Sequence, residues 1–105
     1  MTKYLLIYHG SFTPPSEEEG QKLMAAWIAW FDSLGDAVVD SGNPVGKSIT
    51  VHLGGKVTDD GGQSPAAGYT IVKAESVDAI AALAKNCPHL ASGGTIEIAP
   101  IIEMG

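Results

Sequence analysis

The order of predicted elements is β-α-β, a hairpin, then β-α-β, and this order predicts an α+β fold of the ferredoxin-like, split βαβ kind. Two observations carry the prediction. An apolar stripe with a capping signal marks one long helix, and residues 68–90 place a strand, a cap and a shorter helix in immediate succession. We therefore expect one domain over 1–105, with an antiparallel sheet that carries both helices on one face.

The first strand is predicted over 3–8, with Tyr4, Leu6 and Tyr8 on one face and Leu5, Ile7 and His9 on the other. Because both faces are largely apolar, the strand is expected to be central and buried on both sides. The face without helices then needs a cover. A second copy related by a two-fold axis is the simplest candidate, so a homodimer through the open sheet face is expected.

The first helix is predicted over 17–34. Ser16 and Glu19 form a capping box, and Gly35 supplies a C-terminal stop. The apolar stripe contains Trp27 and Trp30.

The middle of the chain is predicted as a short strand at 37–40 and a hairpin. In the hairpin, Ile49, Val51 and Leu53 face inward, His52 faces outward, and Gly54-Gly55 forms a two-residue turn.

In the second half, a strand at 68–74 leads through Ser76 into a helix at 77–86. The helix ends before Pro88, so His89 is expected on a loop. A last strand is predicted over 95–99, with Pro100 interrupting the ladder.

Composition narrows the class of function. The net charge is −6, from 6 basic and 12 acidic residues, which argues against nucleic-acid and anionic-membrane partners. A single cysteine cannot form an internal disulfide, and the first apolar run is too short for a signal peptide. Both points favour the cytoplasm. Cys87 is expected to be a small buried apolar side chain.

The opening 3–8, the Trp-containing first helix, the segment 38–42 and the ending 94–104 together resemble the YCII-related family, and are closest to its branch with a DGPF motif. The resemblance covers nearly the whole chain and implies a dimeric α+β barrel. Two departures are visible. The loop 59–63 reads Asp-Asp-Gly-Gly-Gln in place of the signature, and the first helix lacks the His that pairs with a later Asp in the original YCII proteins.

Candidate site residues follow from chemistry at element ends. His89 is a candidate base at the mouth of a pocket between sheet and helices, or a polar residue of the connecting loop. Asp40 and His9 are candidate catalytic partners. Their alternatives are an Asx turn at 40–42 and a strand-end His bonded to a carbonyl. Trp27, Trp30 and Tyr8 are assigned to a ligand pocket, with core packing as the alternative for the two tryptophans.

The expected function is therefore the binding of a small neutral or aromatic molecule, with acid–base chemistry through His89 and Asp40 left open. One alternative is a non-catalytic dimeric binding module. Another is a haem- or metal-linked oxygenase with His89 as axial ligand, which colour on purification would reveal. No resident metal or other cofactor is predicted, because the sequence lacks a calcium-loop or phosphate-loop pattern.

Overall fold

The computed structural model describes residues 1–10 and 13–104. Its helices and strands follow one another as β1 (Thr2–His9), α1 (Glu17–Leu34), a 3₁₀ turn (Gly35–Ala37), β2 (Val38–Asp40), β3 (Thr50–Val51), β4 (Val57–Thr58), β5 (Ala66–Ala74), α2 (Val77–Ala84), α3 (Pro88–Ala91) and β6 (Thr95–Pro100). The domain predicted over 1–105 also includes residues 11, 12 and 105, which lie outside the described residues.

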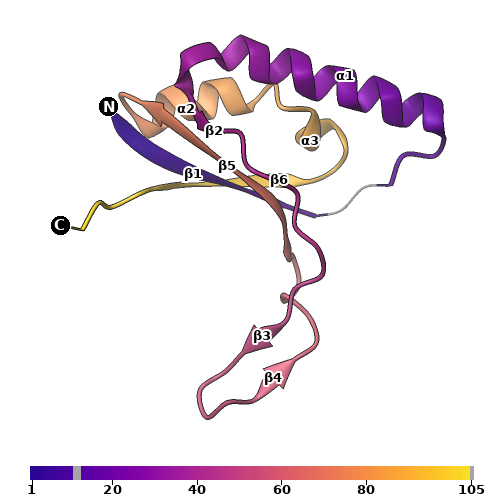
Figure 1. Ribbon diagram of the computed structural model, residues 1–105, viewed down its shortest axis with the longest axis vertical. Helices are drawn as coiled ribbons and strands as arrows, with labels where there is room; N and C mark the ends of the chain where they lie inside the picture. The colour runs from indigo at the N-terminus through magenta and orange to yellow at the C-terminus, as the bar shows by residue number, and fades with distance from the viewer. Residues whose placement is uncertain (11–12, 105) are drawn as a thin grey trace.

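Four strands form one antiparallel sheet in the order β2-β5-β1-β6. Strand β1 is one of the two inner strands, and its Leu6 lies opposite Thr70 of β5 and Ile98 of β6. Figure 1 shows α1, α2 and α3 on the same side of this sheet. The predicted α+β, ferredoxin-like class is thus confirmed. The sheet of one chain is open, so a closed barrel requires a second copy and stays a prediction.

Helix α1 has the predicted bounds, because its two ends are specified locally. The Ser16 hydroxyl accepts a hydrogen bond from the Glu19 N–H at 3.1 Å, which satisfies one of the free donors of the first turn. At the other end, Gly35 adopts a φ of 54° and donates its N–H to the Phe31 carbonyl.

The core lies between the sheet and the helices. Tyr4, Leu6 and Tyr8 point into it from β1, and Trp30 meets them from α1. The remaining buried apolar residues are Leu34, Val72, Ala74, Ile80, Ala84 and Cys87. On the opposite face, Leu5, Ile7 and Ile71 are only half-buried in the single chain, although both faces of β1 were expected to be covered.

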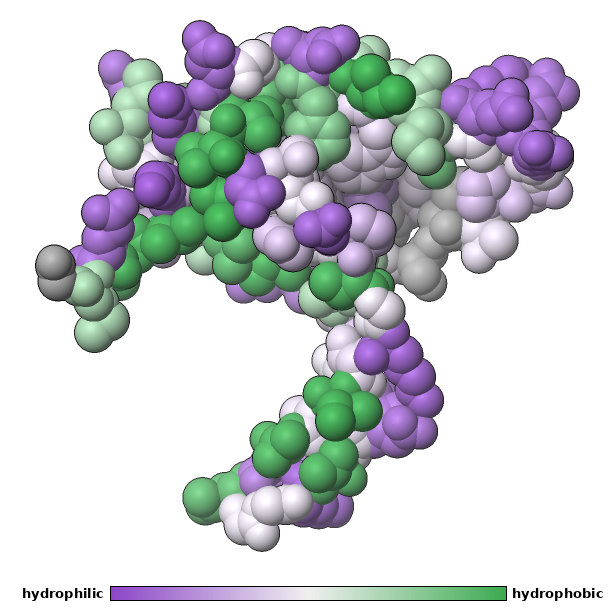
Figure 2. Space-filling view, viewed as in Figure 1, coloured by the Kyte–Doolittle hydropathy of each residue, from purple (hydrophilic) through white to green (hydrophobic). Residues whose placement is uncertain are grey.

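The hairpin departs from its prediction in two ways. Its strands have two residues each, and the turn runs from His52 to Gly55, closed by a hydrogen bond from the Gly55 N–H to the His52 carbonyl at 3.0 Å. The hairpin also extends away from the sheet (Figure 1), and apolar side chains are visible on it in Figure 2. The expected inward residues are therefore exposed: Ile49 at 62%, Val51 at 67% and Leu53 at 104%.

The segment after α2 also differs from the prediction. Helix α2 ends at Ala84, and Pro88 begins a separate one-turn helix, α3, in which proline needs no N–H partner. His89 therefore lies on a helix rather than on a loop. Strand β5 starts two residues earlier than expected, and Pro100 pairs with Tyr4 at the sheet edge, where a missing N–H is tolerated.

Candidate functional site

A cleft of about 480 Å³ opens between the sheet and helix α1. It differs from three larger hollows of the described surface, which have about 570, 660 and 730 Å³, because those contain no aromatic side chain. Its lining consists of Tyr8, Met24, Trp27, Phe31, Ser41, Gly42, Asn43, Pro44, Ala67, Gly68, Tyr69, Thr70 and His89. Apolar and aromatic surface with a few polar atoms is the usual character of a small-molecule site.

Three rings of the lining stand close together and at steep angles. The Tyr8 ring lies 5.2 Å from Trp27 and 5.5 Å from His89 between centroids, with interplanar angles of 90° and 66°. Trp27 and His89 are 6.4 Å apart. Edge-to-face packing of this kind holds the rings in fixed orientations, so the cleft is built on rigid elements of β1, α1 and α3.

One wall of the cleft is the loop after β2. This loop lies close against β5 because two glycines, which have no side chain, allow the two backbones to approach. Gly42 has a φ of 77°, and a Cβ there would lie 1.7 Å from the Tyr69 carbonyl oxygen. A Cβ on Gly68 would lie 3.1 Å from the Asn43 carbonyl oxygen. The Asp40 carboxylate fixes the entry to this loop by accepting the Gly42 N–H at 2.8 Å, which is the Asx turn.

A hydroxyl relay crosses the floor of the cleft. Thr70 is fully buried and donates its hydroxyl to the Ser41 carbonyl at 3.0 Å. Since a threonine hydroxyl has one proton, the contact of 2.8 Å between Tyr8 Oη and Thr70 Oγ1 must be donated by Tyr8. Burial raises the pKa of Tyr8 to about 12, so the phenol is neutral at physiological pH.

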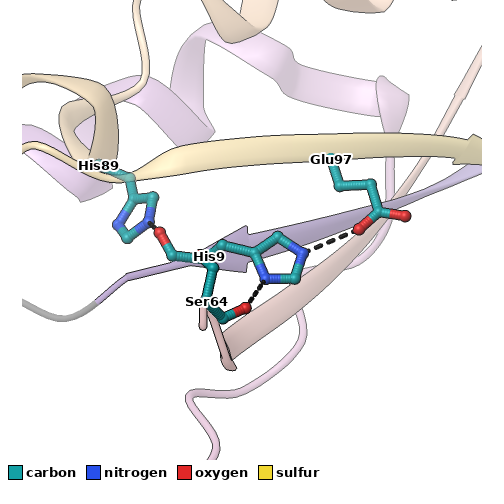
Figure 3. A network of polar contacts seen from close by, with 4 residues as sticks. All are labelled: His9, Ser64, His89 and Glu97. Atoms are coloured by element: carbon teal, nitrogen blue, oxygen red, sulfur yellow. Dashed lines mark hydrogen bonds and ion pairs between the residues drawn. The ribbon is translucent and has the colours of Figure 1, made fainter. Parts of the chain in front are cut away.

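His89 is fixed through one ring nitrogen. Its Nε2 lies 2.7 Å from the His9 carbonyl oxygen, and because a carbonyl only accepts, Nε2 must be the donor. Gly94 permits this approach, since a Cβ there would lie 2.1 Å from Nε2. Figure 3 shows the second nitrogen, Nδ1, turned away from that carbonyl. The neutral ring therefore has its lone pair on Nδ1.

The His9 side chain lies with Glu97 on the face of the sheet that has no helices (Figure 3). Its Nδ1 is 2.7 Å from the Ser64 carbonyl oxygen and its Nε2 is 2.8 Å from a Glu97 carboxylate oxygen. Both nitrogens face acceptors, an arrangement that the protonated ring satisfies fully. The bond to Glu97 and then the one to Ser64 accordingly raise the pKa of His9 above its ordinary 6.5.

The predicted site residues divide into two groups. Tyr8, Trp27 and His89 line the cleft together. Asp40, His9 and Trp30 are not among its lining residues. The Asp40 carboxylate is engaged in the Asx turn, His9 reaches the site only through its carbonyl, and Trp30 is a core residue that donates its indole N–H to the Leu83 carbonyl at 3.0 Å. The acid–base pairing of His89 with Asp40 is a prediction that no described contact supports.

Sequence reasoning missed Thr70 and the loop 41–44 as parts of the site. A signal for Thr70 was available, because it shares its strand face with Val72 and a polar residue buried at a core position needs a partner. The loop carried no such signal, since its position depends on how Gly42 and Gly68 bring two distant backbone segments together.

Within residues 1–10 and 13–104, no three side chains of the His, Cys, Asp or Glu type gather in a way that could hold a metal ion. None of the helices in the described part of the chain combines the length and the apolar character needed to cross a membrane.

Comparison with known proteins supports the fold. Among solved structures, the chain is similar to 5-chloro-2-hydroxyhydroquinone dehydrochlorinase (TftG) from Burkholderia phenoliruptrix AC1100, in complex with 2,5-dihydroxybenzoquinone. The identity is 20%, the TM-score is 0.53, and the match covers 96% of this chain and 95% of that one. No curated protein matches the sequence. The sequence model of the YCII-related domain matches residues 3–105, and the chain therefore belongs to the YCII-related family.

Proposed function

We propose that this protein binds a small, neutral, aromatic molecule in the cleft beside Tyr8, Trp27 and His89. The observation that carries the proposal is the cleft itself, whose volume of about 480 Å³ suits a single substituted ring and whose walls are largely aromatic. The net charge of −6 adds to the case, because it disfavours anionic ligands.

The comparison with TftG supports the same class of ligand. That dehydrochlorinase holds a small hydroxylated ring compound, 2,5-dihydroxybenzoquinone, on a fold of the same class. The likeness extends over nearly the whole of both chains, so a pocket for a ring of this size is compatible with the fold. The identity of the molecule that this chain binds is a separate matter, since one fold hosts many chemistries.

Within this proposal, His89 is the candidate base. Its Nδ1 has a lone pair in the tautomer that the His9 carbonyl selects, and this nitrogen is the one able to take a proton from a ligand. The Asp40 carboxylate accepts a hydrogen bond from the Gly42 N–H. This contact argues against an acid–base pair of Asp40 and His89. It favours ligand binding without catalysis, or catalysis by His89 alone. An oxygenase in which His89 ligates iron through Nε2 would have to break the bond to the His9 carbonyl.

We further propose that two copies associate through the open face of the sheet. The face offers Leu5, Ile7 and Ile71, and in a small domain the burial of such a strip against a second copy is favourable. We also propose that the chain is a single domain, that it is cytoplasmic and that it belongs to the DGPF branch of the family. This proposal is supported by the order of the sequence motifs and by the lone cysteine.

The experiment that tests ligand binding is a titration followed by ¹H–¹⁵N NMR, with resorcinol as the probe. The two indole N–H resonances report separately, since Trp27 lines the cleft and the Trp30 indole is bonded to the Leu83 carbonyl. Saturable shifts of the Trp27 indole and the His89 amide, with a smaller shift for Trp30, are expected. Absence of any shift up to millimolar resorcinol, or shifts confined to another surface, would overturn the proposal.

A further inference from the structure

We propose that the inner end of the cleft selects ligands that donate hydrogen bonds, so that the preferred ligand is an uncharged ring bearing hydroxyl groups. The inference rests on the proposed function, that the cleft binds a small ring, and adds the polarity of the groups that this ring must present. It follows from the direction of the hydrogen bonds already made by Tyr8 and His89.

Tyr8 contributes an acceptor. The Tyr8 hydroxyl donates its proton to Thr70 Oγ1, because Thr70 donates its own hydroxyl proton to the Ser41 carbonyl. The lone pairs on Oη are therefore what Tyr8 offers a ligand. Thr70 and Ser41 both belong to the cleft lining, which places the hydroxyl end of Tyr8 at this wall.

His89 contributes a second acceptor. Donation from Nε2 to the His9 carbonyl leaves Nδ1 without a proton in the neutral ring. Within the described residues, Nδ1 has no hydrogen-bond partner. Every buried side-chain nitrogen and oxygen of those residues does have a partner, so Nδ1 is not among the buried atoms. Nδ1 is thus open to the cleft or to solvent and is able to accept a hydrogen bond from a ligand.

The two acceptors belong to neighbouring rings. The Tyr8 and His89 rings are in edge-to-face contact, with centroids 5.5 Å apart, and both line the cleft, so one bound ring lies beside both residues. Polar side chains that can both donate and accept, Ser41 and Asn43, are exposed and lie at the rim. The constraint therefore applies to the inner end of the ligand, and the outer end is free to carry other groups.

Ligands that present only acceptors are disfavoured. An ether oxygen, a quinone carbonyl or a carboxylate would place its lone pairs against those of Tyr8 and His89 and would lose its hydrogen bonds to water without replacement. A site whose polar atoms can only accept hydrogen bonds distinguishes ligands with donors from ligands without them. The loss of one hydrogen bond lowers the affinity roughly tenfold.

The test compares three probes on the intact protein by isothermal titration calorimetry. They are resorcinol, its dimethyl ether 1,3-dimethoxybenzene, which keeps the oxygens and lacks the donors, and benzoate, which is anionic. The expected result is that resorcinol binds at least roughly tenfold more tightly than either of the others. Equal or tighter binding of the ether would overturn the inference and leave the proposed function standing. Equal or tighter binding of benzoate would overturn both the inference and the neutral class of ligand in the proposed function. No binding of any probe would overturn both.

Two variants separate hydrogen-bond polarity from the larger size of the ether. His89→Gln places an amide N–H where Nε2 donates and replaces the Nδ1 acceptor by an amide oxygen at a different position, and Tyr8→Phe removes Oη. Each is expected to reduce the preference for resorcinol severalfold, whereas His52→Gln on the exposed hairpin is the matched control and should leave it unchanged. If the preference survives in both folded variants, exclusion of the ether by size is the explanation and the inference is wrong.

Discussion

Replacement of Trp30 by alanine tests whether the core is organised around α1 as described. Trp30 is 5% exposed, packs at 5.8 Å from Trp27 and at 5.2 Å from Phe31 between ring centroids, and donates its indole N–H to the Leu83 carbonyl. The substitution removes the ring from a packed site and leaves that carbonyl without its donor. Loss of the aromatic side chain costs about 3–5 kcal/mol of unfolding free energy, and the lost hydrogen bond adds about 1 kcal/mol.

The assay is equilibrium urea unfolding followed by circular dichroism, with Trp30→Phe and Ile28→Ala for comparison. Since the total free energy of unfolding of a small domain is about 5–15 kcal/mol, Trp30→Ala should remove a large part of the stability or unfold the chain. Trp30→Phe keeps most of the apolar packing and should lose about 1–2 kcal/mol. Ile28 is 56% exposed, so its truncation should change little. A Trp30→Ala midpoint within error of the parent protein would refute the core assignment.

The other predictions concern titration, reactivity and assembly. The His9 pKa is raised in the folded protein, so the stability that the charged ring adds is present below about pH 6.5 and is lost as the pH rises through the folded pKa. Glu97→Gln should lower the His9 pKa measured by NMR titration. An unchanged pKa would contradict the pairing of His9 with Glu97. Burial raises the pKa of Cys87 to about 11, so native protein should react slowly with a thiol reagent and unfolded protein rapidly; fast native labelling would show that the thiol is accessible. The protein should be a dimer by light scattering and Ile7→Glu should shift it towards monomer; a monomeric parent at micromolar concentration would exclude the sheet-face dimer.

Most of the fold could be predicted because local signals and burial agree. Ser16 and Gly35 specify the ends of α1 by hydrogen bonds within one turn. The alternation of Tyr4, Leu6 and Tyr8 identifies the buried face of β1, and it restricts the register with β5 to pairings that keep the apolar side chains on that face. Such features need only a few neighbouring residues, so the sequence contains them.

The parts that could not be predicted depend on contacts between distant segments. The alternation of Ile49, Val51 and Leu53 predicts an inward face, but the direction in which the hairpin extends is a tertiary property, and those residues are exposed in the single chain. The same holds for His9. Its face was predicted from the strand period, yet its contacts with Ser64 and Glu97 join residues 55 and 88 positions away.

The candidate site was predicted in part for the same reason. Tyr8, Trp27 and His89 stand at element ends or on an apolar stripe, where sequence patterns point to a pocket. Asp40 occupies a turn that its own residue type explains, so a carboxylate at a strand end was a weak indication of catalysis. The direction of the Tyr8–Thr70–Ser41 relay, which defines the polarity of the cleft, requires the three-dimensional contacts.

The most direct test of the central claim is a crystal structure of the protein grown with saturating resorcinol. The account predicts a ring in the cleft beside Trp27, with one hydroxyl within hydrogen-bonding distance of His89 Nδ1 or Tyr8 Oη. A cleft that contains only water while resorcinol is found on another surface, or a ring that turns both hydroxyls away from these two atoms, would contradict it.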